Sequence, residues 1–184
     1  MATKRKVRRP YERVTLNVRN QSARSGSIKL IVVHSTESHE RPGNADLEAI
    51  GSWFNNSKSQ ASSHVCVDKE GRSAKYVNDA KKAWHCAGYN SVSLGIEQIG
   101  FSADSESKWT DKQLDKVARY IAYWSDRYDI PIRKGKVRKG VVKRSGSVRH
   151  SDLGVEGGNH GDPGRGYPLR KVLRLARRYR KEGW

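Results

Sequence analysis

The predicted fold is organised around one short stretch near the start of the chain, Lys29-Leu30-Ile31-Val32-Val33-His34. A run of consecutive aliphatic residues, mostly β-branched, is typical of a strand that is buried on both faces of a sheet. We therefore expect a rigid central strand here. His34 closes this strand, so its imidazole is expected to be held in one position.

Further strands are expected on both sides of this stretch. Residues 14–18 alternate between apolar and polar side chains and predict a short edge strand. Residues 62–67 and 73–77 flank a turn-like tetrapeptide that ends in glycine, which indicates a hairpin. Residues 91–100 predict another strand, and Glu97 lies inside it.

Two segments have the apolar spacing of helices that pack on a sheet. Residues 46–54 predict a helix for which Asn44 is available as the N-terminal cap. Residues 110–128 predict a longer amphipathic helix, in which Thr110 and Gln113 would form a capping box. Both helices are expected to cover a sheet.

Basic residues give the chain a net charge of +18 and gather in three segments. Residues 1–12 are expected to form a flexible arm, and residues 133–149 a mobile loop. Residues 169–181 predict a short C-terminal helix with arginines opposite one apolar face. Such a protein is drawn to polyanions, whether nucleic acid, anionic lipid or an acidic cell wall, and charge alone does not choose among them.

These elements predict a single α/β domain over residues 13–184, with a central mixed sheet flanked by helices. The polar residues 19–27 are expected to connect two strands as a loop. Cys66 and Cys86 are too few for a disulfide framework and are expected to be small buried residues. No apolar run approaches the roughly 20 residues that span a bilayer, and no secretory signal is visible, so we expect a protein made in the cytoplasm.

The glycine-rich stretch from Arg149 to Gly164 holds two histidines, at positions 150 and 160, and two aspartates. Its glycines and proline predict an ordered loop with unusual backbone angles. Imidazole and carboxylate groups on a stiff loop are what a zinc site needs, and His34 offers a further ligand from a rigid strand. The alternative is a polar surface loop, because a histidine taken singly is more often structural than a ligand.

Six blocks of sequence, taken together and in order, resemble one family. They are Ile31–Glu37, Ser62–Asp68, Ala83–Gly88, Ser93–Gly100, Arg149–Leu153 and Gly161–Gly164. The family is the zinc-dependent N-acetylmuramoyl-L-alanine amidases, which share a fold with the peptidoglycan recognition proteins. The resemblance is nearest to the amidase domains of phage endolysins that attack Gram-positive or mycobacterial-type walls, and it covers residues 28–176.

This resemblance implies site residues one position at a time. Zinc would be held by His34, His150 and Asp162, and Glu97 matches the glutamate that acts as general base. Many relatives carry a lysine that steadies the oxyanion two residues before the ligand aspartate, where this chain has His160. An imidazole there could also donate a hydrogen bond, but it would make this step sensitive to pH near neutrality.

Some of these positions also allow structural interpretations. Glu97 could be a sheet residue paired with an arginine, and Asp152 could either orient His150 or cap the loop. His64, Trp84 and His85 are candidates for substrate binding, but His64 could instead support the site by hydrogen bonding, and His85 could merely pack. Ser63 stands where some relatives have a tyrosine and His39 is expected to be a solvated loop residue, so neither is given a catalytic role.

The resemblance implies zinc-dependent hydrolysis of the amide between N-acetylmuramic acid and L-alanine in peptidoglycan, by a monomeric phage lytic enzyme released through a holin-type lesion. The basic segments could hold the enzyme on teichoic acids or other anionic wall polymers. Three alternatives remain: a non-catalytic peptidoglycan-binding module of the same fold, a metal-dependent nuclease, or a protein that disrupts membranes through its basic helix. No specific nucleic-acid contact is expected, since no recognition motif is present.

Overall fold

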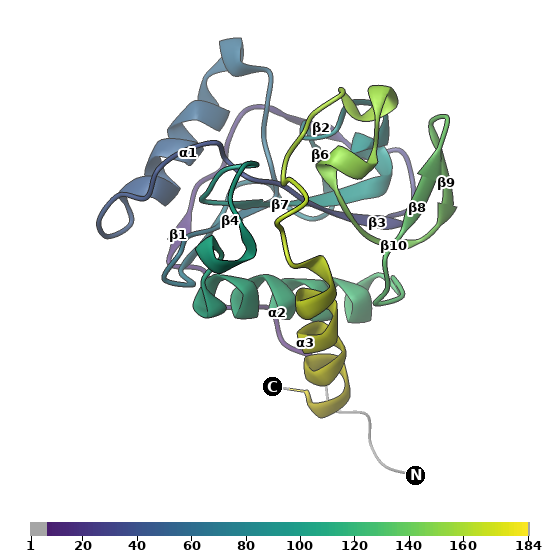
Figure 1. The fold of residues 1–184 in the computed structure, drawn as a ribbon. Helices are drawn as coiled ribbons and strands as arrows, with labels where there is room; N and C mark the ends of the chain where they lie inside the picture. Colours follow the sequence, from purple (N-terminus) through teal and green to yellow (C-terminus); the bar gives the residue numbers. More distant parts are fainter. Residues whose placement is uncertain (1–6, 184) are drawn as a thin grey trace.

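The computed structural model describes residues 7–183 of the chain, and its architecture confirms the predicted α/β domain with a central mixed sheet. Six strands form this sheet in the spatial order β1-β5-β4-β7-β3-β10 (Figure 1). Only the β4–β5 pair is antiparallel. The strands are β1 (Val14–Thr15), β5 (Ser73–Lys75), β4 (Val65–Val67), β7 (Ser93–Gln98), β3 (Leu30–Val33) and β10 (Gly146–Arg149).

Strand β3 lies between β7 and β10, and all its residues are buried, as the aliphatic run predicts. It is parallel to both neighbours, so the three strands end at the same edge of the sheet. The backbone N–H of His34 continues the pairing beyond β3 by donating to the carbonyl of Ile96 at 2.9 Å. His34 is therefore fixed at the end of a three-strand platform.

One face of the sheet packs against two helices, α2 (Asp111–Arg127) and α3 (Leu169–Glu182), which cross beneath it in Figure 1. Alternate strand residues supply the apolar contacts: Ile31, Val33, Val65, Val67, Leu94 and Ile96. Only half of the expected capping box forms. Thr110 accepts from the Gln113 backbone N–H, whereas the Gln113 amide donates to the carbonyls of Val67 and Ile99 and so ties α2 to the sheet.

The opposite face is covered by helix α1 (Ala45–Asn55) and by loops. Leu30 and Val32 pack there in a small apolar cluster with Tyr89 and Leu153. Asn44 precedes α1 as predicted, but its side chain makes no capping hydrogen bond. Five short 3-10 turns lie within residues 7–183: Ser57–Ser59, Ala87–Val92, Glu106–Lys108, His150–Asp152 and Val155–Gly157.

The expectation of a mobile loop over residues 133–149 is wrong. Strands β8 (Lys136–Arg138) and β9 (Val141–Arg144) form an antiparallel hairpin there, and β10 follows. The two residues between β8 and β9, Lys139 and Gly140, both have positive φ, as tight hairpin turns require. Val137 and Val142 anchor the hairpin by packing on the cluster around Leu30, and the surrounding cations hide this pattern in the sequence.

Two other segments also differ from expectation. Residues 19–27 were predicted as a loop, but β2 (Gln21–Ala23) pairs antiparallel with β6 (Lys81–Ala83). Residues 1–12 were predicted as a flexible arm, of which 1–6 lie outside the described residues. Within 7–12, Val7 is buried and Arg9 pairs with Asp79 at 2.6 Å, so this part is packed on the domain.

Three further expectations agree with the structure. Cys66 and Cys86 are free and buried. The helix predicted over residues 169–181 is α3. Within the described residues, no helix has the length and apolarity needed to cross a membrane.

Candidate metal centre

The candidate site lies at the edge of the sheet where β3, β7 and β10 end. His34 follows β3, Glu97 is near the end of β7, and His150 follows β10. Asp162 comes from the loop that leads toward α3, and two hydrogen bonds hold this loop: Ser151 N–H donates to the Asp162 carbonyl and the Ser151 hydroxyl to the Pro163 carbonyl. Parallel strands that end together are a frequent location for functional side chains.

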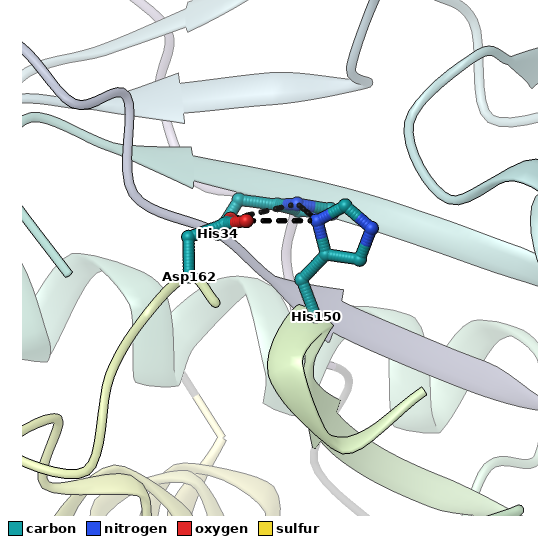
Figure 2. Close-up of side chains that lie close together, drawn as sticks. All are labelled: His34, His150 and Asp162. Carbon is teal, nitrogen blue, oxygen red and sulfur yellow. Dashed lines mark hydrogen bonds and ion pairs between the residues drawn. The ribbon is translucent and has the colours of Figure 1, made fainter. Parts of the chain in front are cut away.

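Three side chains converge there from separate elements (Figure 2). The Nδ1 atoms of His34 and His150 lie 3.0 Å apart. One Asp162 oxygen lies 3.3 Å from His34 Nδ1 and the other 3.0 Å from His150 Nδ1. Donors around a tetrahedral zinc ion at about 2.0–2.2 Å would be about 3.3–3.6 Å apart, so small outward movements would suffice to hold one.

The chemistry of the donors also fits a cation. The Nε2–H of His150 donates to the Gly157 carbonyl at 2.8 Å, which leaves the lone pair of Nδ1 facing His34 and Asp162. No lysine or arginine of residues 7–183 forms an ion pair with Asp162; its partners are imidazoles and the Ser35 N–H. Lone pairs and a carboxylate that face one buried point are stabilised when a cation lies among them.

Burial and hydrogen bonding set the protonation states of these donors. Burial lowers the pKa of His34 to about 4, which outweighs the opposing influence of the Asp162 carboxylate and favours the neutral imidazole. Although burial alone raises the pKa of Asp162, its contacts with the imidazoles of His150 and His34 lower that pKa well below the usual range. Two neutral imidazoles and one carboxylate are the form in which these groups bind zinc.

Glu97 faces the same cleft. Burial, followed by the negative charges of Asp162 and Glu37, raises the pKa of its carboxyl well above the ordinary value. No arginine or lysine in the described part of the chain forms an ion pair with it. The arginine-paired interpretation is therefore not supported, and the raised pKa suits a group that both takes and gives a proton.

His160 lies at the mouth of the site. Its side chain is 61% exposed, and its ring stacks on that of His150 with a centroid distance of 4.5 Å. Its Nδ1 is 3.8 Å from an Asp162 oxygen. The predicted contact with a substrate oxygen is thus sterically open, but it stays a prediction.

The three candidate substrate-binding residues have different positions. Trp84 and His85 line the cleft. His64 is fully buried beneath it, where its Nδ1 accepts from the Gly95 N–H and its Nε2–H donates to the Lys81 carbonyl. Burial and the charge of Arg24 lower the pKa of His64 to about 3. This environment matches the supporting role and not substrate contact.

The cleft is about 530 Å³ in volume and extends well beyond the donor atoms. Its far wall includes Ile50, Trp53 and Phe54 of α1. Trp53 lies within the helix predicted over residues 46–54, yet it is 56% exposed and lines the cleft. In the sequence, Trp53 has the same helical spacing as the buried apolar residues of α1, so its exposure could not be predicted.

Two further expectations concern Asp152 and His39. Asp152 caps the turn after β10: it accepts from the Arg149 backbone N–H at 3.0 Å and from the Arg149 guanidinium. The capping alternative is therefore confirmed over the one in which Asp152 orients His150. His39 is exposed, as expected, and its ring contacts Phe101.

Comparisons with known proteins bear on this arrangement. Residues 24–165 match the family model described as N-acetylmuramoyl-L-alanine amidase. A search of curated proteins found no match to the chain. Among solved structures, AmpD has a TM-score of 0.68 at 20% identity, with 90% of this chain and 95% of AmpD covered.

Two other solved structures represent different branches of the fold. The endolysin N-acetylmuramoyl-L-alanine amidase LysCS from Clostridium intestinale has a TM-score of 0.55 at 17% identity, over 88% of this chain and 94% of LysCS. PGRP-SA from Apis mellifera has a TM-score of 0.64 at 15% identity, over 88% of this chain and 94% of that protein. These likenesses confirm the expected fold, which amidases and peptidoglycan recognition proteins share.

Proposed function

The chain belongs to the N-acetylmuramoyl-L-alanine amidase family, and from this premise we propose that it hydrolyses the amide between N-acetylmuramic acid and L-alanine in peptidoglycan with the help of zinc. The observation that carries the proposal is the convergence of His34, His150 and Asp162 beside Glu97 in one cleft. Three protein donors leave a fourth tetrahedral position open, which is typical of catalytic zinc sites.

The residues have separate roles in the proposed reaction. His34, His150 and Asp162 would hold a zinc ion, which would supply Lewis acidity and lower the pKa of a water molecule toward about 7. The Glu97 carboxylate accepts the proton of the attacking water and returns it to the nitrogen of the departing L-alanine. Its raised pKa favours holding the proton between these two transfers.

His160 would act on the acyl side. From the mouth of the cleft, its ring N–H can donate to the amide carbonyl oxygen as that oxygen gains negative charge. The stacked His150 ring limits where the His160 imidazole can lie.

The test is the release of new L-alanine amino termini from purified peptidoglycan. It is run with a chelator, without it, and with zinc restored after chelation. Release that the chelator abolishes and zinc restores supports both the scissile bond and the metal. Release that persists unchanged in chelator would contradict the zinc requirement.

A peptidoglycan-binding module without activity is the second candidate, because PGRP-SA shares the fold. The complete donor set and the unpaired Glu97 carboxyl favour the enzyme. Cosedimentation with peptidoglycan separates the two: binding without release in any metal condition would support the module.

We also propose a lytic role in the life of a phage, with synthesis in the host cytoplasm and release by a holin-type membrane lesion. The support is the endolysin-like sequence blocks and the fold shared with LysCS. In this interpretation, bacteria that express the chain lyse only when a pore-forming protein is also expressed. Lysis by the chain alone would contradict this route of release.

Two basic surfaces are suited to anionic wall polymers. On the β8–β9 hairpin the exposed cations are Lys136, Arg138, Lys139, Lys143 and Arg144. Helix α3 carries a stripe of Arg170, Arg174, Arg177 and Lys181 at helical spacing, all exposed. We expect wall binding to weaken from about 0.01 M to 1 M salt, as the Debye length falls from about 30 to 3 Å. Binding that is independent of salt would contradict this role.

A further inference from the structure

His85 contacts one of the proposed metal ligands from below. Its Nδ1 lies 2.9 Å from Nε2 of His34, the nitrogen that faces away from the donor cluster. On the other side of the ring, His85 Nε2 lies 3.0 Å from the Ser93 hydroxyl. That hydroxyl in turn lies 2.8 Å from the Tyr89 carbonyl. The four groups form one continuous hydrogen-bonded chain.

The donor in each of these hydrogen bonds follows from the last group, the Tyr89 carbonyl. A carbonyl only accepts, so the Ser93 hydroxyl donates to Tyr89 and must itself accept from His85 Nε2–H. A neutral His85 then has a lone pair on Nδ1, which accepts from His34 Nε2–H. His34 is left with its lone pair on Nδ1, the atom that faces His150 and Asp162.

The surroundings of His85 hold it in this orientation. The side-chain oxygen of Asn90 accepts from the backbone N–H groups of His85 and Cys86, at 2.9 and 2.7 Å. Gly95 lies against the imidazole: a Cβ there would be 2.8 Å from His85 Nδ1 and 2.9 Å from its Cγ. Only a glycine at this position lets the ring lie close to strand β7.

We infer that His85, aligned by Ser93, is a positioning residue that fixes the tautomer and ring orientation of His34 for metal binding. His150 obtains the same effect from a backbone carbonyl, that of Gly157. His34 depends on side chains instead, so its alignment can be changed by substitution. This inference rests on the proposed zinc site, and it assigns His85 a role other than substrate binding.

The experiment measures the zinc affinity of the whole protein by competition with a chromophoric chelator. His85→Leu removes the acceptor at similar volume, and we expect zinc to bind about 10–100-fold more weakly, the usual cost of losing an outer partner of a ligand. His85→Asn can place an amide oxygen near the position of Nδ1, and we expect it to stay within about threefold of the parent. The Co2+-substituted proteins should show a changed visible spectrum for His85→Leu alone.

Three results would separate the possible failures. If the parent protein does not bind zinc, the proposed metal site itself is wrong. If the parent binds zinc and His85→Leu binds it equally well, the positioning role is wrong. If His85→Asn loses as much affinity as His85→Leu, the ring contributes through packing and not through its acceptor, which also overturns the inference.

Two further variants keep the test decisive if His85→Leu does not fold. Ser93→Ala removes the hydroxyl that orients His85 without touching His34, and we expect a smaller loss of zinc affinity in the same direction. Gly95→Ala should displace the His85 ring and weaken zinc binding as well. Urea unfolding of the metal-free variants checks that each is folded, and unchanged zinc affinity in both folded variants would contradict the inference.

Discussion

The two faces of the central sheet differ in the residues that they present, most clearly along strand β7. Toward α2 and α3, strands β3 and β7 present Ile31, Val33, Leu94 and Ile96, all aliphatic and all fully buried. On the opposite face, β7 presents Ser93, Gly95 and Glu97, every second residue along the strand. Strand β3 packs Leu30 and Val32 in an apolar cluster on that face and is followed by His34 at the cleft. One strand thus serves both faces.

The difference separates stability from chemistry. On the helix side, aliphatic side chains exclude water, and one can replace another of similar volume at modest cost. On the cleft side of β7, each residue has a task that depends on one group: the hydroxyl of Ser93, the missing side chain of Gly95 and the carboxyl of Glu97. We therefore expect substitutions on the two faces to change different measured quantities.

The largest effect is expected from removing a metal donor. Asp162→Ala leaves two imidazoles, and the loss of zinc affinity should exceed the roughly 10–100-fold that outer partners cost. Zinc content after dialysis and release of L-alanine amino termini should both fall. Glu156→Ala, exposed on the same loop, is the matched control and should keep both. Full zinc content in Asp162→Ala would contradict its assignment as a ligand.

The next effect concerns Glu97 and separates metal from turnover. Glu97→Gln keeps the shape of the side chain but cannot accept a proton. Turnover should fall by about 10²–10⁴-fold, the usual contribution of a general acid or base, while zinc content stays at the parent value. Parental turnover in this variant would show that another group takes the proton.

A substitution on the helix side should lower stability and leave zinc binding and turnover unchanged. Ile121→Ala, in the middle of α2 and fully buried, should lower the free energy of unfolding by about 2–5 kcal/mol. The folded fraction should keep parental zinc affinity and turnover. Lys112→Ala, on the exposed side of α2, should change stability by less than about 1 kcal/mol. A large loss of zinc affinity in Ile121→Ala would show that the two faces are coupled.

A smaller effect is expected from pH on the metal-free protein. The pKa of His34 is lowered to about 4 and that of His64 to about 3, in each case mainly by burial. Below the ordinary value of about 6.5 the unfolded chain binds more protons than the folded one, so the free energy of unfolding should fall as pH drops from about 6.5 toward 4.

Glu97 opposes this trend, since a raised pKa favours the folded state as pH falls. Urea unfolding in chelator is therefore best done in the Glu97→Gln protein. Adding His64→Gln should make the pH dependence shallower. An unchanged slope would show that the protonation of His64 does not differ between the folded and unfolded states in this pH range.

The sequence predicts the helix-facing side better than the cleft side. Periodicity alone finds β3, β7 and the helices α1, α2 and α3, because their burial depends on the apolar pattern. It fails for the β8–β9 hairpin and for β2 paired with β6, because these strands are held by backbone pairing, and the two valines that anchor the hairpin, Val137 and Val142, lie among charged residues. The Lys139–Gly140 turn is the one local signal of the hairpin.

The site could be predicted only in part from single residues. His34 and His150 stand out because one ends an aliphatic strand and the other opens a glycine-rich loop. The choice of Asp162 and Glu97 depended on the family resemblance, because an acidic residue in a loop or strand carries no sign of its distant neighbours. The link from His85 to His34 was not predicted, since it depends on ring orientation and on the absence of a side chain at Gly95, against which the His85 ring lies.

The separation of the donors along the chain has a consequence for the order of folding. His34 and His150 are 116 residues apart, and they meet because β10 pairs with β3. A nascent chain that has not yet reached β10 carries only one of the three donors. Long-range pairing of this kind is slow to form compared with local contacts. Metal uptake should therefore report completion of the domain, so that catalytic competence is acquired in a late step of folding.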